Sequence, residues 1–116
     1  MKTLLGFVLL FVTSCATSTV TNRDQVRGTI RKSLPQIKDC YVSALKEKPD
    51  LKGKIQIHFE VDDSGKVPSC ETKTSDLNTP SVDKCICERI SVIKFPPAPK
   101  GQKADIIYPF VFSYSD

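Results

Sequence analysis

The chain lacks most of the residue types from which cofactor and nucleic-acid sites are built. It contains no tryptophan and a single histidine. It has no glycine-rich phosphate-binding loop, so no nucleotide cofactor is expected. No run of lysine or arginine exceeds two residues and the formal net charge is only +4, which favours solubility over nucleic-acid binding. No catalytic constellation is recognisable. We therefore expect a protein that is not an enzyme and that uses no cofactor, no metal and no small-molecule substrate.

Long apolar runs are also missing. The segment from Leu4 to Val12 is apolar over roughly 9 residues, too short to cross a bilayer but typical of the core of an export signal. It ends in Val12-Thr13-Ser14-Cys15, which resembles the lipobox of bacterial lipoproteins, where cleavage precedes a lipid-modified cysteine. The resemblance implies that residues 1–14 are a signal peptide and that Cys15 is lipidated. An ordinary secretory signal that contains a cysteine is the alternative.

A short tether follows this cysteine. Residues 15–22 are rich in threonine and serine and show no apolar period. Fully extended, the stretch from Ala16 to Asn22 reaches only about 25 Å, so a domain over residues 23–116 is expected close to a membrane. The lipid on Cys15 makes the membrane one partner and places the protein in the bacterial cell envelope, facing the periplasm. Ala16, where an aspartate would signal inner-membrane retention in some bacteria, favours the outer membrane.

Two amphipathic helices are predicted. Apolar residues recur every three or four positions between Asn22 and Leu45. Pro35 lies inside this pattern, so the helix is expected to kink there or to restart with Ser33 as its cap. A second helix is expected to begin at Thr79-Pro80 and carries a mostly apolar stripe.

Three strands are predicted around these helices. Residues Lys54 to Val61 alternate strictly between apolar and polar and form the clearest strand in the chain. Turn residues 62–65 follow, and Lys66 to Thr74 then reads as a weaker strand that contains Pro68 and completes a hairpin. The aromatic stripe from Ile106 to Tyr114 predicts a last strand, interrupted by Pro109, with its aromatic side chains in the core.

The prolines indicate the order of these strands. Proline has no N–H to donate to a neighbour, so Pro68 and Pro109 both favour edge strands. The proline-free first strand is then central. A right-handed crossover through the second helix puts both helices on one face. The prediction is an α+β fold in the order helix, β-hairpin, helix, strand, with a three-stranded antiparallel sheet of order second, first, third.

Four cysteines remain after Cys15, namely Cys40, Cys70, Cys85 and Cys87. An even number in a small exported domain predicts disulfides, with three possible connectivities. The alternative is a periplasmic thiol- or metal-active protein that binds copper or zinc through Cys70, Cys85 and Cys87. Residues two apart on a helix point about 200° from each other, which disfavours that site. His58, on the polar face of the first strand, is expected to be a solvated surface residue.

The ordered set of local motifs is similar to the AgmX/PglI C-terminal domain, itself similar to the TonB carboxy-terminal domain. The matching segments are Cys40-Tyr41, Leu45, residues 49–55, residues 63–67, Cys85-Ile86, Phe95-Pro96 and Tyr108-Pro109-Phe110. The resemblance covers about residues 26–113 and implies the arrangement derived above, with a disulfide between Cys40 and Cys85. Cys70 and Cys87 are then left to pair with each other.

The same resemblance implies a function. The chain has neither the inner-membrane helix nor the long proline-rich spacer of TonB-like energy transducers, so it is not expected to transmit force. What remains is an exposed sheet edge of the kind on which such domains receive an extended segment of a partner. We expect Ile107, Pro109, Val111 and Ser113 to form this edge, and the partner to be another envelope protein. The resemblance thus favours an interaction module in envelope or motility-related assemblies.

Overall fold

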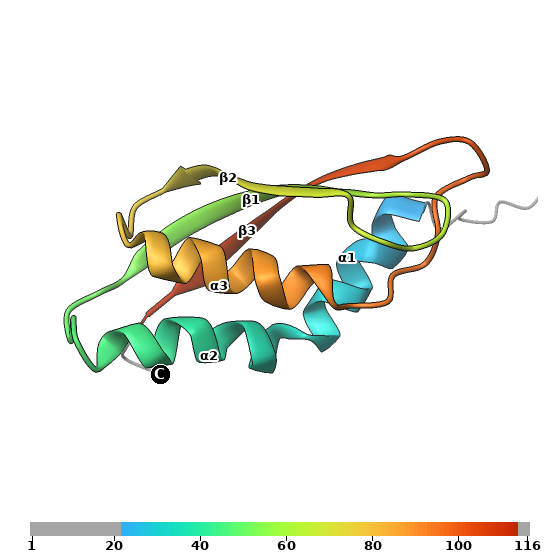
Figure 1. The fold of residues 1–116 in the computed structure, drawn as a ribbon. Coiled ribbons are helices and arrows are strands. Elements are labelled where there is room, and N and C mark those ends of the chain that lie inside the picture. The colour runs from blue at the N-terminus through green and yellow to red at the C-terminus, as the bar shows by residue number, and fades with distance from the viewer. Residues whose placement is uncertain (1–21, 114–116) are drawn as a thin grey trace, which may run out of the picture.

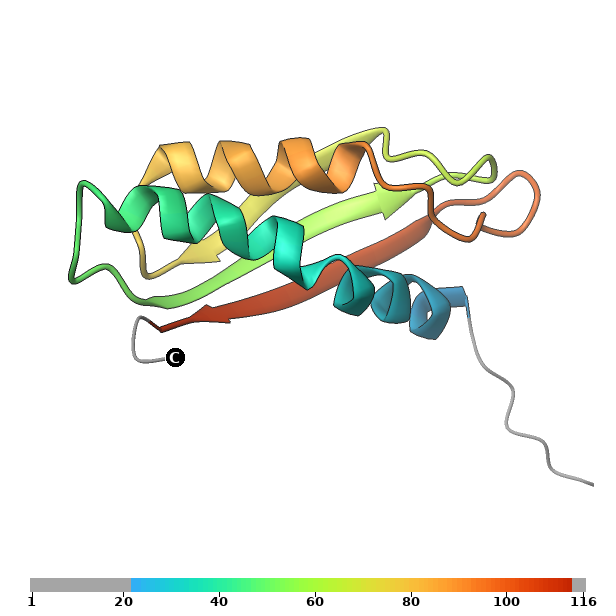
Figure 2. The same cartoon turned by 90° about the horizontal axis from the view of Figure 1, so that it is seen from below.

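A computed structural model describes residues 22–113, which form three helices and three strands. In chain order these are α1 (Asn22–Lys32), α2 (Leu34–Leu45), β1 (Gly53–Val61), β2 (Ser69–Ser75), α3 (Pro80–Ser91) and β3 (Ala104–Phe112). The helices α2 and α3 lie side by side over one face of the sheet, and α1 crosses β3 (Figure 1; Figure 2). The fold is α+β, as the sequence predicts.

The sheet is antiparallel with the order β2-β1-β3, which confirms the predicted order. The apolar residues of β1 face the helices and are completely buried, and its polar residues lie on the opposite face. From β3, Phe110 and Phe112 join this core at 2 % and 7 % exposure. Phe112 stacks on Tyr41 of α2, with ring centroids 4.8 Å apart. The period-two patterns of the sequence therefore give the two faces of the sheet.

The first predicted helix is two helices in the structure. The chain turns at Ser33, whose N–H donates to the Ile30 carbonyl (2.9 Å), and α2 restarts with Pro35 in its first turn. A proline in the first turn also begins α3, where Pro80 follows Thr79. Thr79 makes no side-chain cap; its hydroxyl donates to the Leu77 carbonyl (2.9 Å) instead. Both proline positions were predicted correctly.

Two strand boundaries differ from the prediction. β2 begins at Ser69, so Pro68 lies just before the strand instead of within it. In the preceding loop, the N–H of Asp62 donates to the Lys66 carbonyl (2.8 Å). Residues 67 and 68 then do not pair with β1, and the pairing begins at Ser69. β3 runs from Ala104 to Phe112 without the expected interruption at Pro109. Tyr114 lies outside the described residues.

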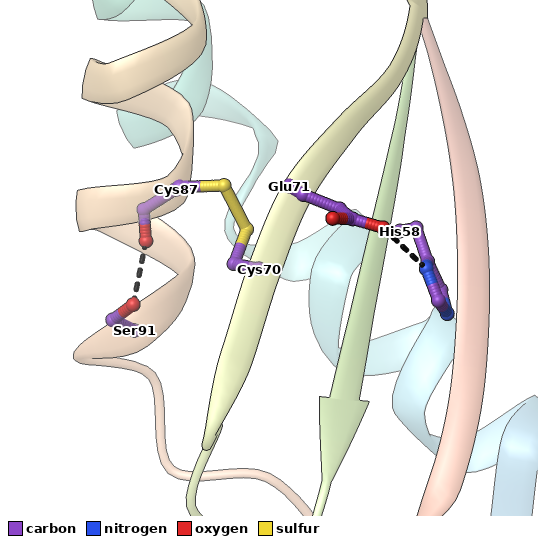
Figure 3. Close-up of a disulfide and its surroundings, with 5 residues drawn as sticks. All are labelled: His58, Cys70, Glu71, Cys87 and Ser91. Atoms are coloured by element: carbon purple, nitrogen blue, oxygen red, sulfur yellow. Dashed lines mark hydrogen bonds and ion pairs between the residues drawn. A yellow bond between two sulfur atoms is a disulfide. The ribbon is translucent and has the colours of Figure 1, made fainter.

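Two disulfides hold α3 on both flanks. Cys85 is joined to Cys40 of α2, and Cys87 is joined to Cys70 of β2, each pair with Cα atoms 5.7 Å apart. The two cysteines of α3 point to opposite sides of the helix. The Cys40–Cys85 bridge therefore fixes the helix layer, and the Cys70–Cys87 bridge, which Figure 3 shows, fixes that layer to the sheet. Cys40–Cys85 is the pair that the family resemblance implies, and Cys70–Cys87 is the pair that it leaves.

The predicted signal peptide, the predicted lipidation site Cys15 and the predicted tether up to residue 21 lie outside the described residues. The buried core residues, from Val26 to Phe112, and both disulfides lie within residues 22–113. In this described part, no helix has the length and apolar character needed to cross a bilayer.

Candidate functional site

The outer edge of β3 is defined by its register with β1. Val111 faces Lys54 across the ladder. The Lys54 carbonyl, however, accepts a hydrogen bond from the N–H of Asp76 (2.8 Å), which lies on the β2 side. The N–H and C=O of one residue in an antiparallel strand point to the same side, so Lys54 does not bond to Val111. The N–H and C=O of Val111 therefore point away from β1, toward the free edge.

The same direction recurs at every second residue of β3, at Ile107 and Pro109. A separate contact supports this, because Arg27 Nη2 of α1 donates to the Ile107 carbonyl at 2.9 Å from outside the sheet. Pro109 presents its carbonyl to the free edge. The N–H that proline lacks would have pointed to the same edge, so β1 loses no hydrogen bond. This is why proline is tolerated in β3 and leaves the strand continuous.

The helix α1 covers the first part of this edge. Arg27 binds the Ile107 carbonyl, and its guanidinium lies 5.8 Å from the centroid of the Tyr108 ring. Figure 2 shows α1 crossing the first half of β3, whereas no helix formed by residues 22–113 lies outside the second half. The accessible part of the edge is therefore the segment from Pro109 onward.

An apolar groove follows this open segment. It encloses about 530 Å³ and is lined by Leu34, Pro35 and Lys38 of α2 and by residues 108–113. Leu34 is 36 % exposed and Val111 is 74 % exposed. Lys38 supplies the only charge among the lining residues described. The groove thus combines outward-pointing backbone groups with apolar side chains, the two requirements for adding a strand.

The structure places the four expected edge residues as follows. Ile107, Pro109 and Val111 are exposed and share the outward register, while Ser113 follows the strand and lines the end of the groove. Ile107 is the one whose carbonyl is already bound. Sequence reasoning missed the wall made by Leu34 and Lys38. Leu34 falls on the apolar stripe of one continuous helix, but the restart at Ser33 shifts the phase and leaves it exposed.

The outer edge of β2 is less suited to strand addition. A hollow of about 780 Å³ is lined by residues of β2 and α3, among them Cys70 and Cys87. The lining includes the charged residues Glu71, Asp83, Lys84 and Glu88. The Cys70–Cys87 disulfide also ties this strand to α3 (Figure 3). We therefore identify the β3 edge as the candidate site.

His58 is not the simple solvated residue expected from the sequence. Its Nε2 lies 2.6 Å from Asp105 Oδ1 of β3, and its Nδ1 lies 3.2 Å from Glu71 Oε2 of β2. The imidazole therefore bridges all three strands on the face opposite the helices, and its side chain is 30 % exposed. Hydrogen bonds to Asp105 and then Glu71 raise the pKa of His58 above 6.5. Figure 3 shows the contact with Glu71.

This bridge predicts a pH dependence that can be measured directly. A raised pKa in the folded state means that the stabilisation is complete below about pH 6.5 and is lost as the pH rises through the folded pKa. The stability difference between the wild type and His58→Gln should thus shrink from pH 6 to pH 9. Because the chain has one histidine, an NMR titration of its ring gives the pKa. Asp105→Asn should lower that pKa more than Glu71→Gln; the reverse order would contradict the geometry.

The aspartates of the hairpin loop have a structural role. Asp62 Oδ1 accepts hydrogen bonds from Ser64 Oγ (2.7 Å), Lys66 N (3.0 Å) and Ser64 N (2.9 Å). These bonds, the Ser64 hydroxyl first, hold the pKa of Asp62 below its usual range. Asp63 Oδ2 accepts from Gly101 N (2.8 Å) and joins the loop to the segment before β3.

The cysteines do not support the thiol- or metal-active alternative. All four are bonded as disulfides, so Cys70, Cys85 and Cys87 have no thiolate to offer a metal. Over residues 22–113, no group of three histidine, cysteine, aspartate or glutamate side chains is placed to hold a metal ion.

Comparison with models of known protein families, with functionally characterised proteins and with solved structures found no match to this chain. The geometry of the β3 edge therefore carries the functional conclusion.

Proposed function

We propose that this protein is a non-enzymatic lipoprotein of the bacterial cell envelope that binds an extended segment of another envelope protein along the β3 edge. The observation that carries the proposal is the open second half of β3, where the backbone groups of Val111 point outward beside an apolar groove. An added strand would pair with these groups, and its alternate side chains would enter the groove.

The details of the edge define how such a segment would pair. Val111 offers both a donor and an acceptor, and Pro109 offers only an acceptor. The Ile107 carbonyl is taken by Arg27. A bound strand would thus be centred on Val111 and would end where α1 begins to cover β3. Leu34 and the aliphatic stem of Lys38 would form the far wall of its side-chain pocket.

The anchor and the family are further parts of the proposal. The lipobox-like residues before Cys15 support a lipid anchor facing the periplasm, with Ala16 favouring the outer membrane. The motif resemblance to the AgmX/PglI C-terminal domain supports a role in envelope or motility-related assemblies. The α+β fold and the sheet order agree with the arrangement that this resemblance implies.

Strand binding can be tested by photocrosslinking in the native cell. A photoreactive phenylalanine analogue at Leu34 should form a specific adduct with an envelope protein, because Leu34 lines the groove. The same analogue at Val92 is the matched control, since Val92 is 82 % exposed and lies outside that groove. Equal adduct yields from both positions would show that the β3 groove is not the binding site.

The lipid anchor can be tested by metabolic labelling with palmitate. The wild type should incorporate the label, and Cys15→Ala should abolish it, because no other thiol is expected to be acylated in a chain whose remaining cysteines form disulfides. An unlabelled wild-type protein in the native host would remove the anchor from the proposal.

A further inference from the structure

Positive charge is concentrated on α1. Three of the four arginines of the chain, Arg23, Arg27 and Arg31, lie in this helix, together with Lys32. The arginines are four residues apart, so successive ones sit on adjacent turns of one face. Asp24 is the only acidic residue of the helix. The buried side is formed by Val26 and Ile30. Arg23 and Arg31 are exposed, whereas Arg27 is half-buried against β3.

The loop before β3 extends this charge. Lys103 lines a hollow of about 550 Å³ together with Arg23 and Arg27. Among its lining residues in the described part of the chain, Asp24 is the only carboxylate, and Glu60 Oε1 lies 3.9 Å from the Lys103 amine. Three cations therefore face two carboxylates here, and Arg31 and Lys32 add further positive charge one turn away. We call Arg23, Arg27, Arg31 and Lys103 the basic face.

The helix that carries Arg23, Arg27 and Arg31 is the element nearest in sequence to the proposed anchor. Asn22 begins α1, and the seven residues from Ala16 to Asn22 span at most about 25 Å. The arginines extend only about 12 Å along the helix axis from Arg23 to Arg31. Figure 2 shows α1 set apart from the α2–α3 layer, at the end where the described chain begins. A lipid on Cys15 would hold this face within reach of the headgroups.

We propose that the basic face binds anionic phospholipid headgroups of the bilayer that carries the anchor. This inference rests on the lipid anchor of the proposed function. Basic side chains close to an anionic surface each strengthen binding about fivefold, and salt screens the effect. With the acyl chains as the main attachment, this contact orients the domain. It keeps α1 against the membrane and leaves the second half of β3, which α1 does not cover, available to a partner.

The inference can be tested on the chain from Ala16 to Asp116, which lacks the lipid but retains the described core and both disulfides. Flotation should show binding to vesicles of phosphatidylglycerol and phosphatidylcholine but not to vesicles of phosphatidylcholine alone. Salt at 0.5 M or above, where the Debye length falls to roughly 4 Å, should release the protein. Arg23→Gln with Arg31→Gln should weaken partitioning about 25-fold.

A matched control separates this face from the net charge of the chain. Lys84→Gln with Arg89→Gln also removes two positive charges, but from the exposed surface of α3. This variant should change partitioning less than threefold if the attraction is local. Equal losses in the two double variants would overturn the proposal, as would equal binding to neutral vesicles or no binding to anionic ones. Unchanged vesicle binding with loss of the Leu34 adduct would assign the arginines to an acidic protein partner and would also overturn it.

Failure of this inference is distinguishable from failure of the anchor. Flotation of the unlipidated chain does not depend on acylation, and palmitate labelling does not depend on the arginines. If the full-length protein is labelled with palmitate but the unlipidated chain does not bind anionic vesicles, only the proposal for the basic face is overturned. An unlabelled protein overturns the anchor, whatever the vesicles show.

Discussion

Replacement of both Cys40 and Cys85 by alanine is expected to lower the free energy of unfolding by about 4 kcal/mol. This disulfide closes a loop with a sequence separation of 45 residues, the longer of the two. It restricts the unfolded chain accordingly, and it joins α2 and α3, which lie side by side over the sheet. Cys40 is 4 % exposed, so the truncation also leaves a small gap under α2. A domain of this size has a total stability of roughly 5–15 kcal/mol, so this variant would be close to unfolding.

Urea denaturation measures the effect. For a slope of about 1–2 kcal/mol per molar, the midpoint should fall by roughly 2–4 M. The matched control replaces Cys70 and Cys87, whose separation is 17 residues. The expected loss there is about 3 kcal/mol, because the loop is shorter. A larger loss from the Cys70 and Cys87 pair than from the Cys40 and Cys85 pair would contradict the assignment of the main covalent constraint to the helix layer.

Local patterns made much of the fold predictable. The strict alternation from Ile55 to Val61 puts all the apolar side chains on one face of the strand. In the structure these apolar residues are completely buried. Pro35 and Pro80 mark helix starts because proline lacks the N–H that an interior helical position needs. Proline also indicated the edge strands. Pro109 lies in an edge strand, and Pro68 lies just before the other edge strand, which begins at Ser69.

Contacts between distant segments were not predictable in the same way. Arg27 meets the Ile107 carbonyl across 80 residues of sequence, and His58 meets Asp105 across 47. Neither contact has a local signature, since an exposed arginine on a helix and a histidine on a polar strand face usually stay solvated. The candidate edge was therefore predicted as a row of residues in β3. The covered half of this edge, its open half and its apolar wall could not be predicted, because they depend on how α1 and α2 pack against β3.

Two neighbouring proline substitutions in β3 should have opposite effects, because the register gives Phe110 and Val111 opposite backbone directions. Phe110 faces Ile55 in a hydrogen-bonded pair, and the residue is 2 % exposed. Its ring centroid lies 4.9 Å from that of Tyr108 and 6.2 Å from that of Phe112. Phe110→Pro should therefore lose a ladder hydrogen bond and a buried aromatic ring. We expect a loss of at least about 4 kcal/mol of unfolding free energy.

Val111→Pro removes only an N–H that points to the free edge and the side chain of a residue that is 74 % exposed. We expect it to cost at most about 1 kcal/mol, because Pro109 already occupies an equivalent position in the strand. Val111→Pro should also reduce the yield of the partner adduct at least tenfold in a protein that carries the photoreactive residue at Leu34. The reason is that the substitution removes the Val111 N–H, the central donor to the bound strand. Unfolding comparable to that of Phe110→Pro would show that the register argument is wrong. A folded Val111→Pro protein with an undiminished adduct would show that the partner binds the groove through side chains, without joining the sheet.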